Sequence, residues 1–169
     1  MSDFEAALRA QLDRNAELAT QRAQAEEEVD CAACERAVAD ARAVREMAGA
    51  QRERHAQLVD ALTAAARGLK EAAPEDFVVR LGWTESGEEF IAKVSTRLVE
   101  PSRSLLIELD RDDDEVLARW HSDIGNALEL WRLLEVDPAV IQQLVLQVAD
   151  QDQWRHARRP PPFPGASQE

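Results

Sequence analysis

The feature that most constrains this chain is its first 73 residues, which contain no proline and only two glycines. They are dominated by Ala, Arg, Glu, Gln and Leu, which are strong helix formers. Pro74 ends the run, because the residue before a proline is driven out of the α conformation. An unbroken helix of this length would extend about 105 Å. The short remainder of the chain cannot cover such a helix, so we predict that residues 1–73 pair with another helix.

A seam for that partner begins at Cys34, where small and apolar residues recur at alternating steps of three and four. This is the a/d heptad spacing of a left-handed coiled coil. The large apolar members are Val44, Leu58, Leu62 and Leu69, and we predict that they bind the partner helix. The whole run is Cys34, Ala37, Ala41, Val44, Ala48, Gln51, His55, Leu58, Leu62, Ala65 and Leu69.

Upstream of this seam the spacing weakens, with Arg22 and Glu26 at seam positions. Consecutive steps of four between Val29 and Ala41 indicate a stutter, which would locally unwind the supercoil. The same weak stretch also fits a bend between two helices, and both interpretations stay open here. The polar His55 on the seam would fix its register at some cost in stability.

After Pro74 the apolar spacing changes to two, which is typical of strands with one buried face. Four strands are expected, and the short connections between them favour an antiparallel meander. The strands are Phe77–Trp83, Phe90–Leu98, Leu105–Leu109 and Val116–Trp120.

Two helices are expected after the strands. Asp123 can cap the first, which would run to Leu134 with leucines and a tryptophan on one side. Asp137-Pro138 supplies the N-cap and first position of the second, in which apolar residues repeat at helical spacing up to Val148. The predicted fold is therefore α+β, with a long N-terminal coiled-coil helix, a four-stranded antiparallel meander and two C-terminal helices.

This pattern divides the chain into three predicted domains: a coiled-coil helix at 1–73, a globular α+β head at 75–155 and a disordered tail at 156–169. The tail contains the sequence Arg-Arg-Pro-Pro-Pro-Phe-Pro, which favours an extended polyproline conformation. As an alternative to disorder, such a segment can dock on an aromatic-lined groove of another protein.

The charge balance restricts the partners. The chain has 20 Lys and Arg against 33 Asp and Glu, a formal charge of −13, and residues 74–157 hold 18 of the acidic and 8 of the basic residues. Nucleic acids and anionic membranes require a cationic surface, so both are disfavoured. No stretch approaches the ~20 apolar residues of a membrane span, and the N-terminus lacks a signal-peptide pattern. We expect a soluble, intracellular protein.

Cys31 and Cys34 are the two cysteines. No second cysteine or histidine pair completes a zinc site with them, and they lie in the middle of the predicted helix rather than at the strand-to-helix start that redox pairs use. We interpret them as small residues of the Ala-rich seam. A metal or disulfide bridge between two subunits is the alternative.

No catalytic motif is present. Asp110, Asp112 and Asp114 match the first, third and fifth ligands of a calcium loop, but Glu115 stands where the loop needs glycine and His121 where it needs glutamate. An acidic hairpin turn is the favoured interpretation. A nucleophile elbow, a Walker loop and a dinucleotide fingerprint are all missing from the sequence. We therefore predict a non-enzymatic protein with no metal and no cofactor.

The order of coiled coil, four strands and two helices resembles an RWD-type domain on a stalk. Globular-headed subunits of the outer kinetochore's microtubule-binding complex and of the monopolin family share that layout. The stretch Glu89–Leu109 is similar to those heads in placing Pro101 between two long strands, and the Glu115–Trp120 strand follows in order. The resemblance implies a dimerising scaffold in kinetochore assembly and chromosome segregation, with a nuclear or chromosomal location.

The sequence thus predicts a scaffold or adaptor that dimerises through its N-terminal helix, with itself or a paralogue, and presents an acidic head to a protein partner. One alternative is a bacterial cytosolic structural or regulatory coiled-coil protein of an unrelated family. The Ala- and Arg-rich composition, in which Lys70 and Lys93 are the two lysines, favours it. A nucleoid-associated DNA binder is a further alternative, which the net charge disfavours.

Overall fold

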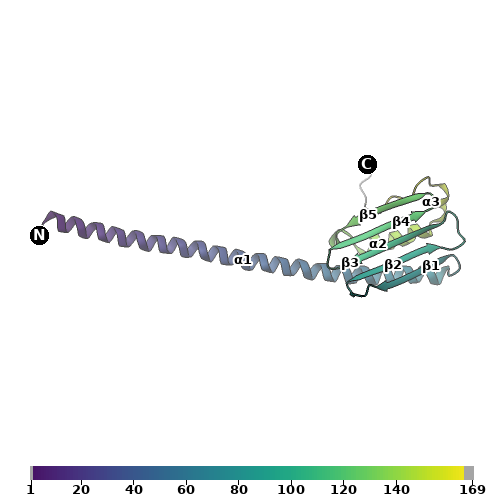
Figure 1. The fold of residues 1–169 in the computed structure, drawn as a ribbon, viewed down its shortest axis with the longest axis horizontal. Helices are drawn as coiled ribbons and strands as arrows, with labels where there is room; N and C mark the ends of the chain where they lie inside the picture. The colour runs from purple at the N-terminus through teal and green to yellow at the C-terminus, as the bar shows by residue number, and fades with distance from the viewer. Residues whose placement is uncertain (1, 166–169) are drawn as a thin grey trace. The chain divides into compact units, whose positions relative to one another are not determined.

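The computed structural model describes residues 2–165 and has an α+β fold (Figure 1). One long helix precedes a sheet, and short helices follow it. The chain divides into two compact units, 1–47 and 48–169, with the division inside the long helix rather than at Pro74. The elements are α1 (Asp3–Ala72), β1 (Phe77–Trp83), β2 (Glu89–Thr96), β3 (Arg103–Asp110), β4 (Glu115–Ser122), β5 (Gly125–Trp131), the 3-10 turn η1 (Leu133–Glu135), α2 (Pro138–Ala149) and α3 (Gln151–His156).

The first unit consists of helix alone. α1 is unbroken from Asp3 to Ala72. The stretch of weak heptad spacing is therefore part of one continuous helix and not a bend between two helices. Every described side chain up to residue 47 is exposed, including those of Phe4, Leu12 and Val44. This part of α1 buries no apolar surface within its own unit.

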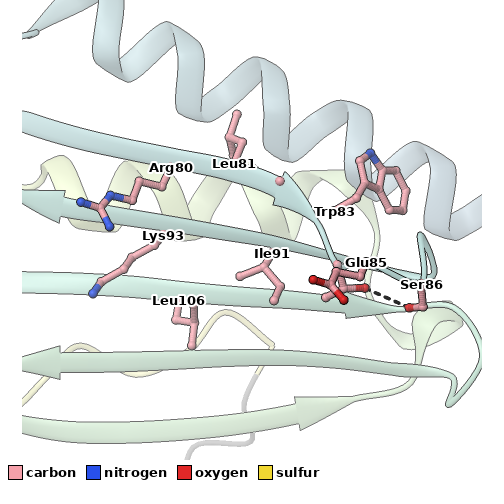
Figure 2. Close-up of a pocket in the computed structure, with 10 residues that line it drawn as sticks. Arg80, Leu81, Trp83, Glu85, Ser86, Ile91, Lys93 and Leu106 are labelled. Carbon is pink, nitrogen blue, oxygen red and sulfur yellow. Dashed lines mark hydrogen bonds between the residues drawn. The ribbon is translucent and has the colours of Figure 1, made fainter.

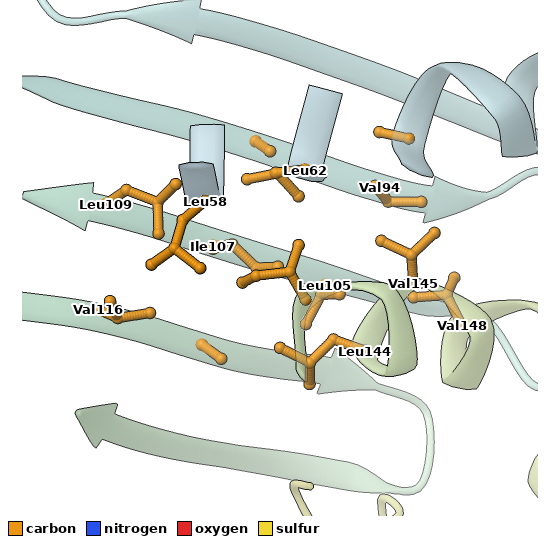
Figure 3. Close-up of a cluster of buried hydrophobic side chains, with 14 of the residues drawn as sticks. Leu58, Leu62, Val94, Leu105, Ile107, Leu109, Val116, Leu144, Val145 and Val148 are labelled. Atoms are coloured by element: carbon orange, nitrogen blue, oxygen red, sulfur yellow. The ribbon is translucent and has the colours of Figure 1, made fainter. Parts of the chain in front are cut away.

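In the second unit the last six turns of α1 pack on the sheet. Leu58, Leu62 and Ala66 have no exposed surface, and they lie among inward-facing residues of the central strands (Figure 3). Polar contacts fix the helix on the sheet, because the Nε2 of His55 lies 2.9 Å from the carbonyl of Leu109 and the Nη1 of Arg54 donates to the carbonyl of Val136 at 2.7 Å. The heptad spacing from Gln51 to Leu69 therefore follows the face of α1 that covers the sheet.

The sheet has five antiparallel strands in the order β1-β2-β3-β4-β5, so the expected meander is correct but the expected number of four strands is wrong. The missed strand is β5, which occupies most of the segment predicted as a helix from Asp123 to Leu134. The turn before it explains the error. Gly125 has a φ of +127°, and the hydroxyl of Ser122 donates to its carbonyl at 2.6 Å, which closes a tight hairpin. Asp123 accepts a hydrogen bond from the amide of Ser102 at 2.9 Å instead of capping a helix.

Two α-helices do follow the sheet, but one of them is not the one expected. α2 begins at Pro138 after Asp137, as predicted. α3 was not predicted. Its N-cap is Asp150, whose side chain accepts from the amide of Gln153 at 3.1 Å, and it buries Trp154.

The core lies between the sheet on one side and α1 and α2 on the other (Figure 3). β2, β3 and β4 each send alternate residues inward, and α2 contributes Leu144, Val145 and Val148. Arg103 is the charged residue within this core, 2% exposed, and its Nε and Nη2 donate to the carbonyl of Val148 at 3.0 and 2.7 Å. Burial lowers the pKa of Arg103.

The segment predicted as a disordered tail at 156–169 is in part packed on the head. Phe163 is buried, with its ring 6.2 Å from that of Trp120 and 6.0 Å from that of Trp131. Gln147 donates to the carbonyl of Pro162 at 3.1 Å. An aromatic site on the sheet therefore holds the one apolar side chain among the prolines, and the last four residues of the predicted tail lie outside the described residues.

Candidate functional site

The residues considered for metal or redox chemistry lie on two separate elements, α1 and the β3–β4 turn. Between residues 2 and 165 no three His, Cys, Asp or Glu side chains group as metal ligands would. Cys31 and Cys34 are both exposed on α1. At the β3–β4 turn, the Oδ1 of Asp110 accepts from the amides of Asp112 and Asp113 at 3.0 and 3.1 Å, which is the geometry of a hairpin turn. The neighbouring Asp110 carboxylate raises the pKa of Asp113.

The predicted seam residues have three different environments. Val44 is 69% exposed on the first unit. Leu58 and Leu62 are fully buried in the head of their own chain, and Leu69 is half-buried beside that core. The apolar surface of Leu58 and Leu62 is thus already used within the chain, and α1 keeps exposed apolar positions upstream of Ala48.

A second surface is the face of the sheet that points away from α1 and α2. The core residues of each strand alternate with residues on this face, and within residues 48–165 the helices pack on the opposite face. We call it the uncovered face. Leu128 and Leu130 are each about half exposed there, and Ile91, Leu106 and Leu117 are partly exposed.

Strand pairing arranges the uncovered face in rows that cross the sheet. Each row consists of residues that pair with one another on neighbouring strands. Three rows follow one another along the strands, about 7 Å apart because alternate residues share a face. We call them the cationic row, the central row and the acidic row. The cationic row is Arg80, Lys93, Leu106, Arg119 and Leu128; the central row is Gly82, Ile91, Glu108, Leu117 and Leu130; the acidic row is Glu89, Asp110 and Glu115.

The two charged rows are not neutralised within the chain. Over residues 2–165 the ion pairs are Arg111–Asp112 and His156–Asp152, and neither involves the rows. In the acidic row, burial and the nearby carboxylates of Glu108 and Asp110 raise the pKa of Glu89. Like charges gathered without counter-charges favour a ligand that brings cations to this row, and the cationic row favours one that brings anions.

At the β1 edge the uncovered face is hollowed. A cavity of about 820 Å³, open to solvent, lies where Gly82 contributes no side chain, and no atom lies within 4 Å of the position its Cβ would take. Arg80, Lys93 and Ile91 line this cavity beside Leu106 (Figure 2). Trp83 turns toward α1 at the strand edge, with its ring 5.7 Å from that of His55 (Figure 2). The hollow and the three rows together form a broad, shallow surface rather than an enclosed pocket.

The uncovered face was missed in the sequence because its rows depend on the pairing of strands. Lys93, Leu106 and Arg119 lie 13 residues apart in turn, and only the register of β2, β3 and β4 brings them side by side. The interpretation of β5 as a helix also removed Leu128 and Leu130 from the sheet. Alternation of polar and apolar residues in the strands was the available signal.

Comparison with models of known families, with curated proteins and with solved structures finds no match. The resemblance to RWD-headed kinetochore subunits therefore stays a prediction, and the fifth strand departs from the four-strand meander on which it was based. Within residues 2–165, no helix combines the length and the apolar character that a membrane span requires.

Proposed function

We propose that this protein is a non-enzymatic scaffold that associates through the N-terminal part of α1 and carries an α+β head as its second interaction module. Its partner along α1 is a helix of another chain, either a second copy or a paralogue. A place in chromosome segregation rests on the RWD resemblance alone.

The observation that carries the proposal is the exposure of large apolar side chains along residues 3–47. Phe4 is 72% exposed, Val29 68% and Val44 69%. Helices in water derive most of their stability from the packing of an apolar face, and this segment buries none within its own unit. A partner helix would supply the missing contacts, and the a/d spacing of Ala37, Ala41 and Val44 is the spacing that such a partner needs.

The head supports the adaptor part of the proposal. It has a complete core of its own, so the uncovered face is free to bind without unfolding it. Apolar residues flanked by unpaired charges are typical of protein interaction surfaces, in which an apolar centre is bordered by a polar rim.

Sedimentation of the full chain with Val44→Asp tests the helical association. A charge buried in an apolar seam should cost several kcal/mol, so the variant is expected to lose association that the wild-type chain shows at the same concentration. Leu62 is unsuitable for this test, because Leu62→Asp would disrupt the core of the head.

Ala43→Asp is the matched control, since it adds the same charge to the neighbouring residue, which lies outside the a/d spacing. It should sediment like the wild-type chain. An unchanged molar mass for Val44→Asp, with association of the wild type intact, would contradict pairing through this seam.

A further inference from the structure

We propose that the uncovered face of the sheet binds the same face of a second copy of this chain, with the cationic row of each copy over the acidic row of the other. This inference goes beyond the scaffold function proposed above, because it concerns a different surface and does not depend on α1. The product is a two-layered β-sandwich made of two heads.

The symmetry of the charges is the main argument. Consider a two-fold axis that lies in the plane between the two faces and runs across the strands, parallel to the central row and directly over it. This axis exchanges the cationic and acidic rows and keeps each strand over its own counterpart. Lys93 and Glu89 are both on β2, and Arg119 and Glu115 are both on β4. The operation therefore sets Lys93 opposite Glu89 of the second copy and Arg119 opposite Glu115 of the second copy, so that four opposite-charge pairs form in each dimer.

The same operation brings apolar residues together at the centre. Leu117 and Leu130 are direct neighbours in the central row and meet their own counterparts across the axis. Sheets packed face to face lie about 10 Å apart with their strands about 30° from alignment, which side chains of this size span. Leu130 is 52% exposed in the single chain, and this contact would cover it.

The size of the face is sufficient for a specific interface. Five strands about 4.8 Å apart and about eight residues long present roughly 600 Å². Two such faces bury roughly 1,200 Å² together, which is at the lower end of the range for specific complexes. A modest, concentration-dependent association is therefore expected rather than a permanent one.

A second copy pairs charges in both rows, at Lys93 and Arg119 in one and at Glu89 and Glu115 in the other, whereas a partner of one sign pairs charges in one row. A basic partner would neutralise the acidic row and repel Arg80, Lys93 and Arg119, and an acidic partner would do the reverse. The hollow beside Gly82 also fits this arrangement, because it leaves room for the side chains of the facing copy at the edge of the apolar centre.

Two carboxylates oppose the association. Asp110 shares β3 with Leu106, so it faces Leu106 of the second copy and gains no counter-charge. Glu108 lies in the central row, so the two-fold axis sets it opposite Glu108 of the second copy. Like charges at the centre of an interface weaken it. Glu108→Gln removes the repulsion at nearly constant shape, and it should lower the dissociation constant of the heads by about fivefold or more.

Zero-length carbodiimide cross-linking of the full wild-type chain tests the proposal directly. Such a reagent joins an amine to a carboxylate in contact with it, and Lys93 is one of just two lysines. Within one chain Lys93 and Glu89 are about 13 Å apart along β2, too far for such a bond. In a mixture of ¹⁵N-labelled and unlabelled chains, we expect mass spectrometry to find Lys93–Glu89 cross-links that join one labelled to one unlabelled peptide. Lys70 on α1 is the internal control and should give no link to the acidic row.

Charge exchange provides the second measurement. Lys93→Glu should weaken association by about fivefold or more, because each substitution replaces two attractive pairs per dimer with repulsive ones. Glu89→Lys should do the same. A mixture of the two variants, or one chain with both substitutions, should restore association to near the wild-type level, which a merely structural effect of either substitution cannot do.

Absence of mixed-isotope links at Lys93 in the wild-type chain, or an unchanged dissociation constant for Lys93→Glu, would overturn the proposal, and the face would then belong to a different partner. This test can be distinguished from the test of helical association through Val44. At concentrations above those of the sedimentation test, where the weaker head contact forms, Val44→Asp should retain the Lys93–Glu89 link, because the sheet surface does not include α1. Loss of the link in chains whose helical association is intact would refute the sheet contact alone.

Discussion

At the scale of single residues, the polar side chains of the head fall into two groups: buried ones that hydrogen-bond to the backbone, and exposed ones on the uncovered face. His55 and Arg103 are almost fully buried, and their donors are directed at backbone carbonyls. Among the described residues, Lys93, Arg119 and Glu115 of the uncovered face have no such partners, and this difference separates residues that hold the fold from residues that are free to bind. Asp110 of the acidic row accepts from two backbone amides of its own turn. The heptad spacing placed His55 on the buried side of the helix, but it could not show that His55 contacts the carbonyl of Leu109, 54 residues away.

Glu89 gives a prediction about pH. Burial and neighbouring carboxylates raise the pKa of Glu89 in the folded chain above its value in the unfolded chain, so the native state binds this proton more tightly. The ionised carboxylate therefore lowers stability at neutral pH, and stability is gained as the pH falls through the raised pKa. Glu89→Gln should increase the melting temperature at neutral pH, and the increase should disappear on acidification.

The measurement is thermal unfolding across a pH series, at a concentration where sedimentation shows unassociated chains. Glu85→Gln, the same change at an exposed turn residue, is the control and should leave the melting temperature nearly unchanged. A gain for Glu89→Gln that persists at acid pH would show that electrostatic repulsion is not its cause.

At the scale of elements, the sequence predicted the strands and helices whose apolar spacing fits one type of secondary structure only. The alternation in β1 to β4 and the Asp137-Pro138 start of α2 are correct in the structure. β5 was not recoverable in this way, because the steps of three between Leu128, Trp131 and Leu134 fit the spacing of a helix and not that of a strand. The segment forms a strand because a hairpin turns at Gly125 and because Asp123 accepts a hydrogen bond from Ser102 in another loop instead of capping a helix. Periodicity in α1 likewise identified a buried face, which we assigned to a partner helix, but Leu58 and Leu62 on that face pack on the sheet of their own chain.

Arg103 joins three elements, and its replacement tests how far they depend on it. It begins β3, donates twice to the carbonyl of Val148 at the end of α2, and donates to the side chain of Gln151 in α3 at 2.8 Å. Its guanidinium carbon also lies 5.4 Å from the ring centre of Trp154. Arg103→Ala leaves buried carbonyls without donors, and we expect a loss of about 2–4 kcal/mol in the free energy of unfolding.

Urea denaturation measures that loss. Arg103→Lys keeps the charge but cannot donate twice to one carbonyl through a planar fork, so an intermediate loss is expected. Arg97→Ala, an exposed arginine beyond the end of β2, should change the free energy of unfolding by less than about 0.5 kcal/mol. Equal effects of Arg97→Ala and Arg103→Ala would contradict the assigned role.

At the scale of the whole molecule, one helix belongs to two units. The predicted boundary at Pro74 follows the change of secondary structure, whereas the compact units divide at Met47 and Ala48. The difference has a physical cause. Residues 48–72 supply, together with α2, the apolar layer that covers the inward face of the sheet, so they belong to the head energetically although they belong to the helix by conformation.

Two truncated chains test this division. A chain that starts at Ala48 keeps Leu58, Leu62 and Ala66 on the sheet, so its head should melt cooperatively at the temperature of the full chain. A chain that starts at Glu75 exposes the core beneath them. Burial of each leucine alone contributes about 1.5–3 kcal/mol, a large share of the stability of a small domain. This shorter chain should be strongly destabilised or aggregate.

Tryptophan fluorescence is the appropriate measurement, because all four tryptophans lie between residues 83 and 154 and report on the head in every chain. Full-length chain and the chain starting at Ala48 are compared at equal molar concentration, so that association through residues 3–47 is the one difference between them. If the chain starting at Glu75 melts at the same temperature as the other two, residues 48–72 do not stabilise the head. α1 would then be a tether along its whole length, and Leu58 and Leu62 would again be available to a partner helix.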